Sequence, residues 1–457
     1  MHWLRVNPLH TEVTGSLDVP PSKYHLHRAL ILAALSHGHS VISGSSTALH
    51  VRHTLRALRD LGIPIDNVSE GYHVKGQAFS PPRGYVRVGS SGSTAQFLLA
   101  LCSLSPHPLT MIGSPNLSRR PLKPLLQAFS RYGIAWQSRG YSLPVTILPG
   151  APKGGDITIP GLLSQWASSL LLVSPFASRP TSLRISPPVA EEPYVQLTWR
   201  MMTLFGLKGS VDWERHEFII APQSLKARDY QAPPDFSSLA FPLAFLALHG
   251  GSLQIHSYRD SQDHPEGTII KLLEDIGLKL HRHDATDTLW AESDGHIRPF
   301  SVSVRDTPDL LPVLAVLAAA ASGRSVITDI ESNRHKESNR VLAMLQLRKM
   351  GAHIEEIGNT LVIHGGKRLH RTELSSFNDH RVLMALALAA SHADAPSRIS
   401  HGYAYRISYP QFLDVMQSLG LQANVVDEDF TDTFRDSIGE DLQSTRRQNV
   451  DDCAGTP

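Results

Sequence analysis

The residues best suited to chemistry lie between positions 333 and 351, in a stretch that begins Asn-Arg-His-Lys-Glu-Ser-Asn-Arg. Three cationic residues, Arg334, Lys336 and Arg340, surround one carboxylate, Glu337. An amphipathic helical pattern follows directly, so the charges stand at a helix entrance, where free N–H groups and the helix dipole favour an anion. The arrangement predicts a site that holds an anion and moves a proton. A solvated helix start with local ion pairs is the alternative interpretation.

Comparable polar clusters precede several other helices, which favours the first interpretation. They are Pro21–Lys23 with Arg28, Gly89–Thr94, Ser164–Gln165, Asp235 with Ser237–Ser238, Pro308–Asp309 and Asn378–Arg381. Taken singly, Lys23 is compatible with a surface lysine, Asp309 with a helix cap, and Arg381 with a partner of Asp379. If like helices point the same way, their N-termini converge, and the cleft between two domains attracts anions.

The helices that must position these clusters repeat along the chain. Six segments rich in Ala and Leu are apolar on all sides, which is typical of buried helices. They are residues 29–38, 95–104, 168–177, 241–250, 313–322 and 382–391. A second, amphipathic kind of helix ends six times at a glycine, and a glycine there suits a left-handed C-cap. These glycines are Gly62, Gly133, Gly206, Gly277, Gly351 and Gly420.

Short β-rich runs complete each unit, which consists of a buried helix, a strand, an amphipathic helix and two strands. Six such units in 457 residues predict an α/β protein of two domains with three units each. We place the first domain at 18–236 and the second at 237–424, with residues 1–17 joining the second. Residues 425–457 are acidic and aperiodic, so we expect a disordered tail.

Composition excludes several classes of protein. Hydrophobic residues make up 41% of the chain, and the net charge of +1 does not favour nucleic-acid binding. No apolar run is long enough to span a bilayer, and the N-terminal segment does not resemble a signal peptide. The two cysteines and the scattered histidines suggest neither a disulfide framework nor a metal site. We therefore expect a cytoplasmic monomer without membrane partners, metal or cofactor.

The ordered set of motifs resembles the enolpyruvyltransferase family, in particular its EPSP synthase branch. The stretches that carry the resemblance run through most of residues 14–415 and include PPSKYHLHRALILAAL, GSSGSTAQFLLAL, RRPLKPLLQAF, PPDFSSLAFPLAF, RHKESNRVLAMLQLRKMGA and NDHRVLMALALAA. The resemblance implies an inside-out α/β barrel in two domains, each of three βαβαββ units. It also implies a transferase that moves the enolpyruvyl group of phosphoenolpyruvate to an acceptor hydroxyl and releases phosphate.

The resemblance assigns roles to individual residues. Asp309 corresponds to the residue that takes the acceptor's proton, and Glu337 to the proton donor for the methylene carbon, with Lys23 assisting. The positions that correspond to the phosphoenolpyruvate site are Lys23, Gly92, Arg120, Gln165, Arg340 and Arg381. Those that correspond to the acceptor site are Arg28, Ser164, Gln165, Tyr194, Asp309 and Lys336. Fixed guanidinium groups suit both the carboxylate and the phosphate of phosphoenolpyruvate.

Departures from the family pattern fall mainly on the acceptor side. Polar residues of the family are replaced there by Tyr24, Leu26, His27, Leu163, Glu191 and Ser332. On the donor side Ser90 and Gln96 are departures, and Ile407 stands where the family has a lysine, with Arg406 beside it as a candidate substitute. A carboxylate facing a phosphate is costly in a dry cleft.

Two readings of the acceptor follow from these departures. Either Glu191 points away from the site, or the acceptor differs from shikimate 3-phosphate and is another hydroxyl compound such as a sugar, cyclitol or nucleotide. The first reading places the chain in the shikimate pathway of aromatic amino acid biosynthesis, and the second in specialised metabolism. A non-catalytic, anion-binding relative is the alternative function. A nucleic-acid end-modifying enzyme is disfavoured by the near-zero net charge.

Overall fold

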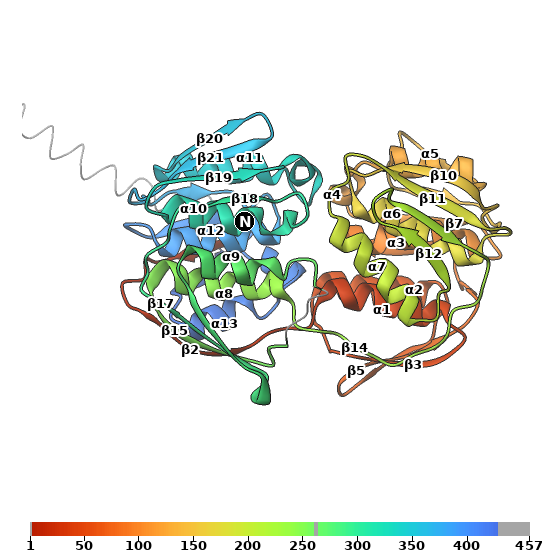
Figure 1. The fold of residues 1–457 in the computed structure, drawn as a ribbon, viewed down its shortest axis with the longest axis horizontal. Coiled ribbons are helices and arrows are strands. Elements are labelled where there is room, and N and C mark those ends of the chain that lie inside the picture. Colours follow the sequence, from red (N-terminus) through yellow and green to blue (C-terminus); the bar gives the residue numbers. More distant parts are fainter. Residues whose placement is uncertain (1, 260–263, 428–457) are drawn as a thin grey trace, which may run out of the picture.

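The computed structural model describes residues 2–259 and 264–427, which form two halves lying side by side (Figure 1). Within this part of the chain each half carries three four-stranded sheets. All six sheets share one pattern, in which a parallel pair is followed by two antiparallel pairings. The predicted α/β class and the sixfold repeat are therefore confirmed.

Each sheet draws its strands from one half of the chain, apart from β1 and β2, which precede the first domain in the sequence but join sheets of the second half. In the first half the orders within the sheets are β14 (Tyr230–Gln231), β3 (Gly38–Ser43), β5 (Gly71–Gly76), β4 (Ile65–Val68); β6 (Tyr85–Gly89), β7 (Leu109–Gly113), β9 (Val145–Ile147), β8 (Trp136–Ser138); and β10 (Gly155–Pro160), β11 (Thr181–Ser186), β13 (Glu217–Ile220), β12 (Gly209–Asp212). In the second half they are β2 (Val13–Asp18), β15 (Gly251–His256), β17 (Thr288–Ser293), β16 (Lys279–His283); β18 (Ser301–Ser303), β19 (Arg324–Thr328), β21 (Thr360–His364), β20 (His353–Ile357); and β22 (Glu373–Leu374), β23 (Ser397–Ser400), β1 (His2–Val6), β24 (Ala423–Asp427).

The six all-apolar segments are helices, and three of them pack together inside each half. They are α1 (Lys23–Leu35), α3 (Gly92–Leu101), α6 (Ser164–Val173), α8 (Phe236–His249), α10 (Leu311–Ala320) and α12 (His380–Ser391). Nearly every residue of these helices is buried, as expected for helices without a polar face. The sheets and the amphipathic helices surround these buried helices, so the buried helices form the interior of each half and the sheets lie outside (Figure 1).

The amphipathic helices lie on the outer layer and end where the sequence predicts. They are α2 (Leu49–Asp60), α5 (Lys123–Tyr132), α7 (Glu192–Leu204), α9 (Thr268–Ile276), α11 (Arg340–Met344) and α13 (Phe412–Ser418), with the short α4 (Pro115–Ser118) in addition. The six glycines that follow them all have positive φ, between 79° and 137°. The fifth amphipathic helix, α11, is shorter than the pattern predicts, because 3₁₀ turns over Leu345–Met350 follow it directly after Met344.

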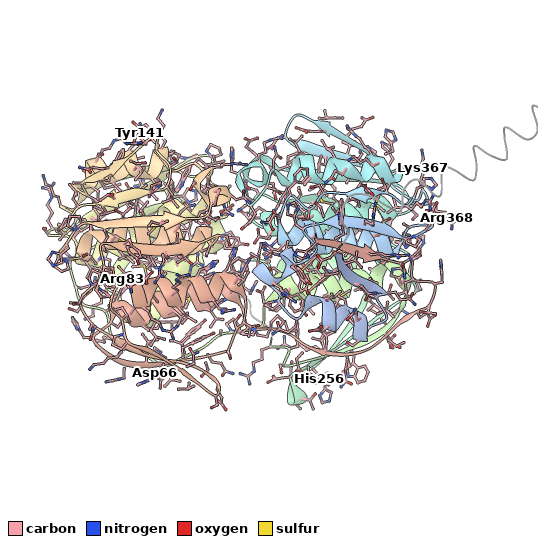
Figure 2. All side chains as sticks on the ribbon, turned by 180° about the vertical axis from the view of Figure 1, so that it is seen from behind. Asp66, Arg83, Tyr141, His256, Lys367 and Arg368 are labelled. Atoms are coloured by element: carbon pink, nitrogen blue, oxygen red, sulfur yellow. The ribbon has the colours of Figure 1, made fainter. Side chains whose placement is uncertain are left out.

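Short 3₁₀ segments connect the larger elements. They are η1 (Cys102–Leu104), η2 (Ser174–Phe176), η3 (Asp284–Thr286), η4 (Pro308–Leu310), η5 (Glu331–His335), η6 (Leu345–Met350) and η7 (Ala404–Ile407). One of these segments, η4, carries the predicted site residue Asp309. Figure 2 shows the side chains on the opposite face. Tyr141 lies at the upper edge and Asp66 at the lower edge of the first half, and Lys367 and Arg368 lie at the outer edge of the second. None of the described helices is long and apolar enough to cross a membrane.

The chain passes between the halves twice. β1 and β2 come first in the sequence but complete sheets of the second half. β14, just before the second crossing, pairs with β3 near the start of the first half. The two crossing segments bond to each other, since Ser22 N donates to Pro233 O at 2.7 Å and Asp235 N donates to Pro20 O at 2.8 Å. Two separate hydrophobic cores result, one drawn from residues 24–225 and the other from residues 4–19 and 236–423.

The C-terminal boundary needs a correction. β24 pairs with β1 as far as Asp427, so residues 425–427 belong to the sheet and not to the expected tail. Antiparallel backbone pairing with β1 includes these residues in the sheet, and it outweighs the acidic composition of the tail as a whole. The rest of the predicted disordered tail lies outside the described residues.

Candidate active site

A polar pocket lies between the halves, where the N-termini of α1, α3 and α6 face the segments around η4 and η5. Ten of the predicted site residues line it: Lys23, Arg28, Gly92, Arg120, Ser164, Gln165, Tyr194, Asp309, Lys336 and Glu337. The guanidinium groups of Arg340 and Arg381 are buried and reach it through contacts with Asp309. The fold thus brings both expected proton-transfer carboxylates to one place.

Arg340 joins three carboxylates. It contacts Asp309 Oδ1 at 2.5 Å through Nη1, Glu337 Oε2 at 2.8 Å through Nη2, and Asp379 Oδ2 at 2.9 Å through Nε. Its side chain is 1% exposed. Arg120, from the other half, holds the second oxygen of Glu337 at 2.8 Å. Three of the four cations expected to bind phosphoenolpyruvate, Arg120, Arg340 and Arg381, are paired with the protein's own acids.

These pairings set the protonation states. Burial by itself would raise the pKa of Asp309, but Arg381 and Arg340 hold that pKa well below its usual value. Burial acts in the same direction on Glu337, and Arg120 and Arg340 likewise hold its pKa well below normal. Burial and Arg381 lower the pKa of Lys23. Both carboxylates are therefore ionised.

The charge cluster around residue 337 differs from the expected one. Arg334 turns outward and pairs with Glu331 at 3.1 Å and Glu356 at 2.6 Å. Lys336 contacts Glu191 of the first half. Of the three cations adjacent in sequence, only Arg340 contacts Glu337, because residues 331–335 form a 3₁₀ segment rather than the first turn of one helix.

Arg381 and Tyr24 meet over Asp309. Arg381 Nη2 lies 3.1 Å from Asp309 Oδ2 and donates to the Tyr24 hydroxyl at 2.7 Å. Tyr24 in turn donates a short hydrogen bond to Asp309. From Arg381, Asp379 accepts only the backbone N–H, at 2.9 Å, as the cap of α12, so the alternative pairing of their two side chains is not formed. Sequence reasoning noted Tyr24 only as a departure and did not predict this contact.

On the acceptor side Glu191 points into the pocket. Its carboxylate accepts Ser164 N at 3.1 Å and Ser164 Oγ at 2.7 Å through one oxygen, and contacts Lys336 through the other. Glu191 adopts φ 60° at the start of α7, a conformation uncommon for residues other than glycine. Leu163 occupies the N-cap position of α6 and has no side-chain cap to offer, so Glu191 satisfies that helix end instead.

Arg28 is a buried cation on the same side of the pocket. Its three nitrogens donate to Thr198 Oγ1 at 2.7 Å and to the carbonyl oxygens of Tyr24 and Tyr194, each at 3.0 Å. The guanidinium stands 4.8 Å from the ring centre of Phe97. Burial lowers its pKa to about 10. Among the described residues no carboxylate forms an ion pair with it, which leaves a positive charge for a ligand.

The donor side is tightly packed. A Cβ atom on Gly92 would lie 2.0 Å from Arg120 Nη1, so only glycine permits this approach. Gln165 is fixed by Ser93 at 3.1 Å and by Gln96 at 2.8 Å. Ile407 is buried, whereas Arg406 is exposed and stands 4.4 Å from the ring centre of Tyr403. Neither of the two residues lines the pocket.

Comparison with known proteins identifies the family. The family described as EPSP synthase (3-phosphoshikimate 1-carboxyvinyltransferase) matches residues 9–416. The chain is 33% identical to the 3-phosphoshikimate 1-carboxyvinyltransferase of Methanocella arvoryzae, over 91% of this chain and 98% of that one. It is 31% identical to the enzyme of the same name from Methanocaldococcus jannaschii, over 90% of this chain and 97% of the other.

A solved structure supports the fold. The EPSP synthase from Acinetobacter baumannii superimposes with a TM-score of 0.77 at 23% identity, over 93% of this chain and all of that one. The chain therefore belongs to the EPSP synthase family and is a transferase of the carboxyvinyltransferase type.

Proposed function

We propose that this protein transfers the carboxyvinyl group of phosphoenolpyruvate to a hydroxyl of an unphosphorylated hydroxy acid. The observation that carries the proposal is the position of Glu191. Its carboxylate uses the donors that the family pattern assigns to the acceptor's phosphate, namely Ser164 and Lys336. An anion bonded to these groups offsets the charge of Lys336 and occupies the donors of Ser164, and it repels a phosphate placed beside it.

The proposal also states that the acceptor carries an acid group, which would bind to Arg28. Arg28 is buried and has no carboxylate partner among the described residues, so an anionic substrate group is the natural one to neutralise it. Two N–H bonds remain on its terminal nitrogens beyond the three hydrogen bonds to the protein. A planar carboxylate suits such a guanidinium group. One cation is thus available for the acceptor, whereas Lys336 is already paired.

Phosphoenolpyruvate binding supplies the change in protonation that the reaction needs. Its carboxylate and phosphate compete with Glu337 for Arg120 and Arg340, so the pKa of Glu337 rises when the donor enters. Glu337 then carries the proton for C3. Lys23, whose Nζ forms no ion pair with a described residue, is available to the donor's anionic groups.

The addition and elimination steps then follow. The acceptor oxygen attacks C2, Asp309 takes the proton of that hydroxyl, and Glu337 delivers a proton to C3, giving a tetrahedral phosphate adduct. In the second step Glu337 removes a proton from C3 and the C–O bond to phosphate breaks. The leaving phosphate takes up the proton that Asp309 holds, so both acids return to their starting states. The arginines and Lys23 stabilise the charge that builds up on the adduct.

Catalysis is favoured over mere anion binding by the arrangement of the acids. A binding protein gains nothing from two buried carboxylates, Asp309 and Glu337, beside its anion site, since they weaken anion affinity. Proton transfer requires them. Arg340 holds both in place from a single guanidinium group.

The test compares two acceptors that differ only in the phosphate. Purified protein is incubated with phosphoenolpyruvate and either shikimate or shikimate 3-phosphate, and phosphate release is followed together with the mass of the product. Further unphosphorylated and phosphorylated sugars, cyclitols and nucleotides complete the panel. We expect the specificity constant to be higher for shikimate than for shikimate 3-phosphate. Efficient use of shikimate 3-phosphate would refute the acceptor assignment, and inactivity with every acceptor would support the non-catalytic alternative.

A further inference from the structure

His27 lies in the pocket and takes no part in the addition and elimination steps. It follows Lys23 by one turn of α1 and precedes Arg28, and its side chain is buried at 1% exposure. The imidazole lines the pocket between the halves. Its Nδ1 is 2.7 Å from Thr54 Oγ1, so Nε2 is the ring nitrogen left for a ligand.

A chain of hydroxyl groups fixes the position of the imidazole proton. Thr94 Oγ1 donates to Ser91 Oγ at 2.7 Å, at the N-cap of α3. Thr94 has therefore used its one hydrogen and must accept from Thr54, 2.6 Å away. Thr54 has then used its hydrogen and must accept from His27 Nδ1. The proton sits on Nδ1, and Nε2 carries a lone pair.

The surroundings keep this imidazole neutral. Burial, Lys23 and Arg28 together lower its pKa to about 3. A neutral ring with a lone pair at Nε2 cannot hold a phosphate or carboxylate, since both offer only acceptors. It can accept a hydrogen bond from an O–H or N–H group.

We infer that His27 determines acceptor specificity by accepting, at Nε2, a hydrogen bond from a free hydroxyl of the acceptor. The inference rests on the proposed function and adds a second requirement to it. The acceptor carries an acid group for Arg28, a hydroxyl that reacts beside Asp309, and a further hydroxyl that is neither phosphorylated nor oxidised. Thr54 is a positioning residue, because it acts only by holding Nδ1.

The tautomer can be measured without knowing the acceptor. In protein with ¹⁵N-labelled histidine, the signals of His27 are identified as those missing from His27→Asn. We expect a neutral ring protonated at Nδ1 in the wild type, and a shift toward the Nε2-protonated form in Thr54→Val, which keeps the shape of the buried threonine. An Nε2-protonated ring in the wild type would overturn the inference.

Kinetics then test recognition with two variants of opposite design. His27→Asn keeps a polar group near Nδ1 and removes the acceptor at Nε2, whereas His27→Gln can place an amide oxygen near Nε2. For the best acceptor of the panel we expect His27→Asn to raise the acceptor KM roughly 5- to 10-fold, the size of one neutral hydrogen bond, and His27→Gln to recover part of it. His39→Gln, an exposed histidine of the same half, is the control and should behave as wild type.

Deoxy analogues of shikimate, each lacking one hydroxyl, locate the contact. One analogue should be used less well than shikimate by the wild type and no worse than shikimate by His27→Asn. If His27→Asn instead weakens phosphoenolpyruvate binding in calorimetry, the imidazole serves Lys23 and the inference fails. If the wild type prefers shikimate 3-phosphate, the proposed exclusion of a phosphorylated acceptor is refuted, but the role of His27 is not. The His27 variants are then compared on shikimate 3-phosphate, whose free hydroxyls can still donate to Nε2.

Discussion

Replacing Glu191 by glutamine isolates the charge that separates this pocket from the family pattern. The amide is nearly the same shape, and its oxygen can still accept from Ser164. What changes is the negative charge, which in this structure is held by Lys336. The two side chains are 3% and 15% exposed, so solvent screens them little.

The magnitude follows from Coulomb's law. The repulsion in question is that between the Glu191 carboxylate and the phosphate of a phosphorylated acceptor. Two unit charges about 4 Å apart interact by about 4 kcal/mol at an effective dielectric constant near 20. The amide of Glu191→Gln would still occupy the donors of Ser164, so we expect the substitution to relieve about 3 kcal/mol of this repulsion. A change of that size raises the specificity constant for shikimate 3-phosphate roughly 100-fold.

The assay is phosphate release at limiting acceptor, with Glu192→Gln as the matched control. Glu192 is the next residue, bonds to Gln196 at 2.7 Å, and does not line the pocket. Leu163→Ser should restore a hydroxyl donor at the cap of α6. The gain in shikimate 3-phosphate use of the double variant Leu163→Ser with Glu191→Ser should exceed the sum of the gains of the two single variants. If Glu191→Gln leaves shikimate 3-phosphate use unchanged, Glu191 does not occupy the phosphate position.

Arg120→Ala should weaken phosphoenolpyruvate binding by about 2–5 kcal/mol in calorimetry while the protein stays folded; Arg340→Ala should weaken it similarly and also lower the melting temperature, because three acids lose their common partner. Wild-type donor kinetics in both variants would contradict the donor site. Asp309→Asn and Glu337→Gln should each lower turnover roughly 10²–10⁴-fold, and phosphoenolpyruvate binding should persist in Glu337→Gln. If a folded Glu337→Gln protein no longer binds phosphoenolpyruvate, Glu337 has a structural role instead. Since the pKa of Glu337 lies below normal in the free protein and rises when the donor takes its arginines, phosphoenolpyruvate binding should take up more protons in wild type than in Glu337→Gln, measured in buffers of different ionisation heat. Equal uptake would contradict the assigned proton donor.

The sequence by itself determined the repeats and the class of chemistry. Buried and amphipathic helices differ in local apolar spacing, and a glycine C-cap is a local signal, so six units could be counted without coordinates. Resemblance supplied the roles of Asp309 and Glu337. It also supplied the departures at Leu163 and Glu191, although not the direction in which Glu191 points.

Only the tertiary structure decided which charges meet. Lys336 and Glu191 are 145 residues apart, and Arg381 and Tyr24 are 357 apart, so no periodicity links them. Sequence neighbours misled at Arg334, which pairs with Glu356 because η5 turns it outward. Strand pairing is also decided by the tertiary structure, because the sheet partners of β1 and β14 lie far away along the chain. Local spacing sets local geometry, whereas the pairing of buried charges depends on how the two halves meet, where each cation must find an anion to be buried at all.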